Sequence, residues 1–181
     1  TTAKITPKTV GLSATKTYDG TTSLTGAVTI STGVGSETLT YTGATASDAN
    51  VATASKYINA ITLGDCSGVS CSGVASNYQL PSLITASAGV NTVTINAATA
   101  VVSATKIYDG GTTLTSGQLT ITGVGGAVLS FTLGTASYSN ANVATSNKYV
   151  NIGTLALTGG AGTSAASNYT LPSSAYNATS N

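Results

Sequence analysis

Apolar and polar residues alternate along short stretches of this chain. Within residues 10–18 the apolar side chains are separated by glycine, serine and threonine, and residues 102–108 repeat the pattern in the same phase. Residues 37–43 and 128–134 alternate in the same way. A period of two is typical of strands with one buried face, and no stretch of ten or more residues has the spacing of an amphipathic helix. The pattern predicts an all-β protein of short strands.

Three sequence blocks occur twice, in the same order and about 90 residues apart. A repeat of this length indicates tandem domains, because solenoid units are shorter. Turn-forming residues separate the strands within each copy, as in small β-sandwiches. The blocks are KTYDGTT (16–22) and KIYDGGTT (106–113), ASDANVATASKYI (46–58) and YSNANVATSNKYV (138–150), and ASNYQLPS (75–82) and ASNYTLPS (166–173).

The phase of the repeat predicts the domain boundaries. Residues 7–96 form a first β repeat and residues 97–181 a second, while residues 1–6 are the end of a preceding repeat or a linker. AKIT (3–6) resembles TVTIN (92–96), the last predicted strand of the first repeat. We expect two tandem small domains, each sandwich-like with an immunoglobulin-like or β-grasp-like topology. The second is expected to lack its last strand or to take one from elsewhere.

The repeated side chains are those that shape turns and fill cores. Asp-Gly supplies positive φ after a strand, the preceding tyrosine can bury its ring, and asparagines favour Asx turns. We interpret the repeated residues as structural. They are Lys16, Tyr18, Asp19, Gly20, Asn50, Tyr57, Asn77 and Tyr78 in the first copy, and Lys106, Tyr108, Asp109, Gly110, Asn142, Tyr149, Asn168 and Tyr169 in the second.

Two other interpretations of the repeated residues stay open. The first is a spontaneous isopeptide cross-link, in which Lys16, Lys56, Lys106 or Lys148 would join Asp19, Asp109, Asn77 or Asn168. The second is carbohydrate binding by exposed tyrosines that stack on sugar rings. Tyr138, which has no tyrosine counterpart at Ala46, and Tyr176 lie in predicted loop or terminal sequence. They are the candidate glycan contacts.

Charge is unusually sparse and excludes several function classes. Charged residues make up 6% of the chain and the net charge is +1, against about 25% charged residues in typical soluble proteins. Without a basic surface we expect no nucleic-acid partner. The chain has no histidine and its acidic residues are scattered, so we expect no enzyme, catalytic residue, cofactor or metal site. It also has no methionine, which suggests a piece of a longer protein.

The two cysteines stand close together in DCSGVSC (65–71). The spacing does not match a CxxC redox motif, and a zinc site would need more ligands. We expect a disulfide between Cys66 and Cys71, which in turn predicts an oxidising, extracytoplasmic environment. No apolar run is long enough to span a membrane, so membrane insertion is not expected.

The three blocks together resemble a known family. K-x-YDG, NVAT-x2-KY and SNY-x-LP, in this order within about ninety residues, are similar to the YDG-type and related MBG repeats of large bacterial surface adhesins, including filamentous-haemagglutinin-like exoproteins. The resemblance implies a non-enzymatic module of a stalk, fibre or biofilm matrix at the cell surface. The expected partners are neighbouring repeats or like chains, joined by strand addition, and the alternative is a carbohydrate- or mucin-binding module.

Overall fold

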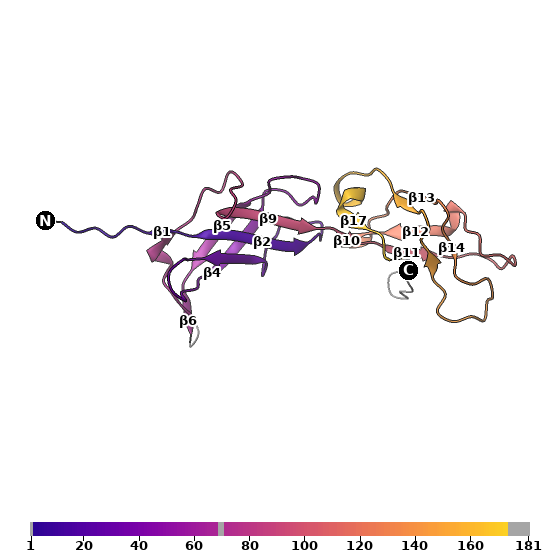
Figure 1. Cartoon of the computed structure of the whole chain (residues 1–181), viewed down its shortest axis with the longest axis horizontal. Coiled ribbons are helices and arrows are strands. Elements are labelled where there is room, and N and C mark those ends of the chain that lie inside the picture. Colours follow the sequence, from indigo (N-terminus) through magenta and orange to yellow (C-terminus); the bar gives the residue numbers. More distant parts are fainter. Residues whose placement is uncertain (1, 69–70, 174–181) are drawn as a thin grey trace. The chain divides into compact units, whose positions relative to one another are not determined.

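A computed structural model describes residues 2–68 and 71–173 of the chain (Figure 1). The described helices are 3-10 turns of three residues, and the rest of the regular structure is strand. The predicted all-β class is therefore confirmed. The chain divides into two compact units, one made of Thr1–Thr17 and Thr21–Asn96, the other of Tyr18–Gly20 and Ala97–Asn181.

A central strand, β2, organises the first unit. It runs antiparallel to β3 and parallel to β9, while β4 pairs with β5, β6 with β7 and β1 with β8. The strands of this unit are β1 (Lys8–Thr9), β2 (Gly11–Thr17), β3 (Val28–Ser31), β4 (Thr40–Ala46), β5 (Ile58–Gly64), β6 (Cys66–Gly68), β7 (Cys71–Gly73), β8 (Tyr78–Gln79) and β9 (Asn91–Asn96), with the turn η1 (Ala75–Asn77) before β8.

The core of the first unit lies under the apolar face of β2. Leu12 and Ala14 are buried, while Ser13 between them and Thr15 after them are exposed, as the alternation predicts. β9 contributes a second alternating face, with Val93 and Ile95 buried. Ile58 of β5 is fully buried. Strands from the start, the middle and the end of this unit's sequence therefore contribute to one core.

Asn91 fixes β9 to the rest of the first unit. Its side chain is fully buried, accepts a 2.9 Å hydrogen bond from the Ile58 N–H and donates to the carbonyls of Ile58 and Ser82 at 3.0 Å. The Val93 N–H also donates to the Lys56 carbonyl at 3.0 Å. β9 is thus held by β2 along one edge and by the β5 region on the other.

The second unit repeats the pairing of the first. β10 runs parallel to β17 as β1 does to β8, and β11 pairs antiparallel with β12 as β2 does with β3. The pairs β13–β16 and β14–β15 take the place of β4–β5. The elements are β10 (Ala98–Thr99), β11 (Val101–Ala104), η2 (Ser116–Gln118), β12 (Leu119–Thr122), η3 (Val124–Gly126), β13 (Phe131–Thr132), β14 (Ser137–Tyr138), β15 (Val150–Asn151), β16 (Ala156–Leu157), η4 (Gly162–Ser164), η5 (Ala166–Asn168) and β17 (Tyr169–Thr170).

The two units differ beside β11. Among the described residues β11 has one partner strand, β12, whereas β2 has two. β11 is also shorter, with four residues against seven in β2. In the first unit residues 15–17 of β2 pair with β9 alone, and the residues of the second unit that match them, 105–107, are not part of β11.

Candidate functional site

The lysine of each YDG block closes the turn that follows it. Lys16 Nζ donates to the carbonyls of Thr21 and Ser23, both at 2.9 Å. Lys106 Nζ donates to the matching carbonyls, of Gly111 at 2.9 Å and Thr113 at 3.1 Å. Hydrogen bonds donated by a charged group are among the stronger ones in proteins. The repeated lysine therefore holds the turn in the same way in both copies.

The Asp-Gly pair shapes this turn. Gly20 and Gly110 both have a φ of +81°, a left-handed conformation that glycine adopts without steric cost. In the second copy Asp109 accepts a hydrogen bond from the Gly111 N–H at 3.0 Å and forms a 2.6 Å ion pair with Lys106. The hydrogen bond from Lys106 lowers the pKa of the Asp109 carboxyl, and the Gly111 N–H lowers it further.

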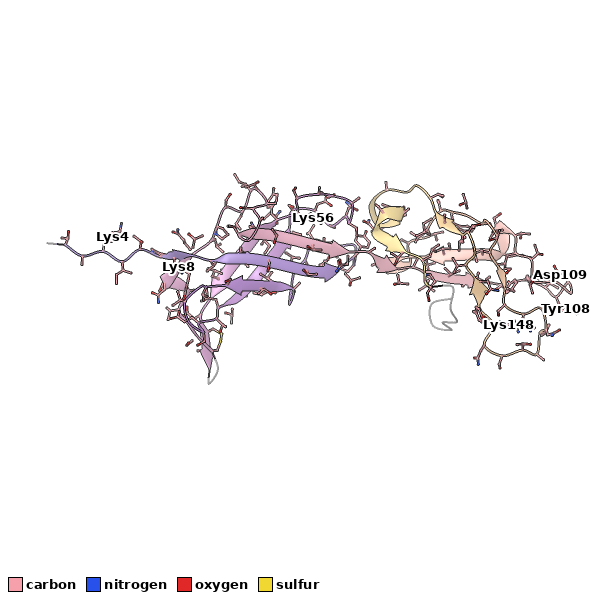
Figure 2. The ribbon with its side chains drawn as sticks, in the orientation of Figure 1. Lys4, Lys8, Lys56, Tyr108, Asp109 and Lys148 are labelled. Carbon is pink, nitrogen blue, oxygen red and sulfur yellow. A yellow bond between two sulfur atoms is a disulfide. The ribbon has the colours of Figure 1, made fainter. Side chains whose placement is uncertain are left out.

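The two YDG tyrosines have different environments. Tyr18 belongs to the second unit, is 3% exposed and meets the Tyr169 ring edge-to-face at 5.5 Å between centroids. Burial raises the pKa of its hydroxyl, which also forms a hydrogen bond with Asn168. Tyr108 is 61% exposed and lies at one end of the second unit (Figure 2). The predicted burial of the ring thus applies to Tyr18 and is wrong for Tyr108.

The second repeated lysine closes a second loop. Lys56 Nζ donates to the carbonyls of Val51, at 3.1 Å, and Thr53. Lys148 Nζ donates to those of Asn142 and Val143 at 3.0 Å and of Thr145 at 2.5 Å. The residue before each lysine has positive φ, +52° at Ser55 and +55° at Asn147. This turn directs the lysine side chain toward the carbonyls of the loop that precedes it.

Sequence reasoning did not find this use of Lys56 and Lys148. The pattern NVAT-x2-KY contains the signal, since the lysine stands a few residues after the carbonyls that it binds. In both copies the tyrosine after the lysine is half-buried, and its N–H donates to a serine hydroxyl, Tyr57 to Ser47 at 3.2 Å and Tyr149 to Ser139 at 3.1 Å.

The Asx turn in this loop lies two residues before its predicted position. Asp48 accepts a 2.6 Å hydrogen bond from the Asn50 N–H, and Asn140 accepts one of 2.7 Å from the Asn142 N–H. The prediction that Asn50 and Asn142 would themselves begin the turn placed it too late, because their backbone N–H groups are the donors. The Asn50 N–H lowers the pKa of Asp48, and the Thr53 hydroxyl adds to the effect.

Asp48 gives the first unit a pH dependence that the second lacks at the matching position. Because the folded pKa of Asp48 lies below its unfolded value of about 3.9, its contribution is present above that pH and is lost as pH falls through the folded pKa. We expect Asp48→Asn to reduce the loss of first-unit stability in acid, since asparagine accepts the same N–H without titrating, as Asn140 does.

The measurement for this prediction is the urea midpoint of the first unit at neutral pH and at about pH 3. The Asp48→Asn chain should show the smaller difference between the two values. Equal acid sensitivity in the two proteins would contradict the assignment.

The SNY block places an asparagine and a tyrosine under a loop. Asn168 is fully buried and donates to the Gly162 carbonyl at 3.2 Å, and the Tyr169 hydroxyl donates to the Thr163 carbonyl at 2.6 Å. In the first unit Asn77 ends η1, and the buried Tyr78 donates to Glu37 at 2.5 Å. This hydrogen bond to Glu37 raises the pKa of the Tyr78 hydroxyl. The asparagine and tyrosine of each SNY block therefore contact residues within their own unit.

The predicted disulfide is confirmed. Cys66 and Cys71 are bonded across the β6–β7 hairpin. The Thr38 hydroxyl lies 3.5 Å from the first sulfur and 3.3 Å from the second. The disulfide links the two strands of the hairpin, and the Thr38 contacts place the segment that leads into β4 beside it.

The second unit contains a cavity of about 230 Å³. Lys106 and Lys148 line it from the two lysine-closed loops, and Tyr138 lines it from β14. The hydroxyl of Tyr138 is buried without a hydrogen-bond partner among residues 2–68 and 71–173, and burial raises its pKa. The Lys106 Nζ lies 5.6 Å from its ring centroid. The remaining lining residues are Ala104, Thr105, Tyr108, Gly111, Asn140, Ala141 and Val143.

The expectation that Tyr138 lies in an exposed loop is wrong. It stands in β14, paired with Val150, and is half-buried, because it occupies the position of the buried Ala46 of the first unit. Tyr176, the other candidate glycan contact, lies outside the described residues.

Neither a metal cluster nor a membrane-spanning helix occurs in the described part of the chain. Within residues 2–68 and 71–173, no three His, Cys, Asp or Glu side chains are grouped to hold a metal ion. No helix in these ranges is long and apolar enough to cross a bilayer. The charged groups of the repeat blocks instead bond to nearby backbone.

In the comparison with known protein families, the model described as YDG domain matches residues 90–178 of the chain. A YDG domain is found there. Its matched range begins just before β9, the strand that the structure places beside β2 of the first unit. No curated protein and no solved structure matches the chain.

Proposed function

We propose that this protein is a structural module, two tandem sandwich-like β domains, of an extracellular bacterial adhesin or matrix protein. The module extends a stalk or fibre and associates with like chains by strand addition. It acts through its shape and its edges, without chemistry of its own.

The observation that carries the proposal is how the repeated lysines are used. Each of the four donates hydrogen bonds from its ammonium group to backbone carbonyls a few residues away. The lysines at equivalent positions of the two copies bind the carbonyls of equivalent residues. Side chains used in this way stabilise a turn and do not need a ligand. A repeated unit built on such turns suits a tandem array.

The disulfide supports the extracellular part of the proposal. Disulfides persist in oxidising compartments and are rare in reducing ones, and Cys66–Cys71 closes a short hairpin. The sparse charge supports association, because a net charge of +1 gives little repulsion between copies. The buried hydroxyl of Tyr138 does not favour the carbohydrate-binding alternative.

Surface labelling of cells that produce the protein tests the proposal. An antibody raised against the 181-residue chain should label intact cells or the fibres around them in immunogold electron microscopy. A cytoplasmic marker protein, labelled in parallel, should stay inaccessible until the cells are opened. Labelling that appears only in opened cells would contradict an extracellular module.

A further inference from the structure

The cavity of the second unit occupies the position that β9 fills in the first. In the first unit β9 pairs parallel with β2, with Val93 opposite Ala14 and Ile95 opposite Lys16. Its inward residues Val93 and Ile95 are buried. The residues of the second unit that correspond to Ala14 and Lys16 are Ala104 and Lys106, and both line the cavity.

Burial differs between the units at the same place. Ala14, Ala46 and Lys56 are buried in the first unit. Their counterparts Ala104, Tyr138 and Lys148 are each half-buried and line the cavity. In the first unit the backbone of Val93 also bonds to Lys56, so β9 bridges these positions. The cavity therefore has the lining that receives a β9-like strand.

The segment Thr2–Thr6 has the pattern of such a strand. By the repeat, Ala3, Lys4 and Ile5 correspond to Val93, Thr94 and Ile95. Ile5 is 98% exposed, which leaves a large apolar side chain uncovered, and the segment extends away from the strands of its own unit (Figure 1). Lys4, labelled on this segment in Figure 2, corresponds to the exposed Thr94, so its charge would face solvent when the strand is bound.

The connection that follows the segment also matches. One residue separates β9 from β10, and the same spacing separates residue 6 from β1. The matched YDG range likewise begins at residue 90, with the strand that precedes its own unit. A chain that pairs its residues 2–6 with a neighbour would therefore repeat the connection already present between β9 and β10.

We infer that the edge of β11 that no described strand occupies, together with the cavity beside it, binds residues Thr2–Thr6 of a second copy of this chain as a parallel strand. Ile5 of the second copy then lies opposite Lys106, and Ala3 opposite Ala104. This inference rests on the proposed association by strand addition and names its site, register and occupant. Each copy would donate a strand through its first unit and accept one through its second, a heterologous contact that forms chains of molecules unless it closes.

The sizes of the side chains fit this register. The acceptor has Tyr138 where the first unit has Ala46, so less room remains beside Ala104 than beside Ala14. The donor has Ala3 where β9 has the larger Val93. A strand backbone in the cavity would also bring carbonyl groups to the buried Tyr138 hydroxyl, a donor that has no acceptor within the described part of the chain.

Sedimentation velocity of the intact chain over a wide concentration range tests the association. The wild-type chain should sediment increasingly fast as its concentration rises, and Ile5→Asp should weaken association roughly tenfold or more by removing a buried aliphatic side chain. Ile84→Asp is the matched control, because Ile84 is 82% exposed elsewhere in the first unit. A monomer at every concentration, or equal weakening by both substitutions, would overturn the inference.

Cysteine cross-linking tests the register. Thr94 pairs with Thr15 in the first unit, so Lys4 of one copy should lie beside Thr105 of the other. A mixture of Lys4→Cys and Thr105→Cys chains should give a covalent dimer on mild oxidation. The yield of this dimer should be about five times that from a mixture of Lys4→Cys and Ser103→Cys chains, since the second pair is offset by two residues along the strand.

Equal dimer yields from the two mixtures would overturn the register and with it the inference. Both experiments use purified chain, so their failure is separate from the surface labelling above. A chain found on the cell surface that does not associate in this way would remove the strand-addition site and leave the extracellular location in place.

Discussion

Replacing Tyr18 by alanine is expected to destabilise the second unit by about 3 kcal/mol or more. The ring is 3% exposed, packs edge-to-face on Tyr169 and gives its hydroxyl a partner in Asn168. Truncation removes a large aromatic side chain and leaves a cavity under a buried asparagine. Hydrogen exchange measured by mass spectrometry, unit by unit in urea, should show earlier unfolding of the peptides that contain β12 and β17.

Tyr108→Ala is the matched control, since the same motif position is 61% exposed in the second copy. An exposed substitution of this kind is expected to change the free energy of unfolding by no more than about 0.5 kcal/mol. Equal destabilisation by the two substitutions would show that the motif, and not its burial, decides the effect.

Asn91→Ala is expected to destabilise the first unit by about 3 kcal/mol. The fully buried amide satisfies the N–H and the carbonyl of Ile58 and a carbonyl at Ser82. Alanine would remove the partner of two buried groups of Ile58, and the cost of an unsatisfied buried group is larger than the mean value of a hydrogen bond. β9 should exchange its amide hydrogens much faster in the variant, ahead of β4 and β5.

Asn96→Ala is the control for this substitution, because Asn96 ends the same strand on its exposed side. Its effect on β9 exchange should be small. If β9 exchanged equally in the two variants, the three hydrogen bonds of the Asn91 side chain would not be what holds the strand.

Local sequence was enough to predict features that depend on neighbouring residues. The alternation around Leu12 and Ala14 identified the buried face of β2, and the short spacing of Cys66 and Cys71 identified the disulfide. In each case the residues that interact, or the face that is buried, can be read within a few positions of the chain.

Features that depend on tertiary contacts could not be predicted in this way. The parallel pairing of β2 with β9 joins residues about 80 positions apart, and the contact of Tyr18 with Tyr169 joins residues still farther apart. Asn91 offered a signal that was missed. It stands on the same strand face as Val93 and Ile95, and a polar residue on a buried face needs partners.

The sequence identified several residues of the candidate site but not their contacts in space. The repeated lysines stood out, yet their acceptors are backbone carbonyls, which a sequence pattern does not display. The cavity could not be predicted from the sequence around Tyr138, because the burial of this side chain follows from the pairing of β14 with β15.

We infer that the repeated side chains serve the fold, and the unfolding free energy of the Lys56→Met chain tests this most directly. Lys56 is 6% exposed and bonds to two carbonyls of its loop (Figure 2), so the substitution should destabilise the first unit by about 1–2 kcal/mol. Lys4→Met, at an exposed lysine, should leave stability unchanged within error. A Lys56→Met chain as stable as the wild type, or more stable, would contradict the account.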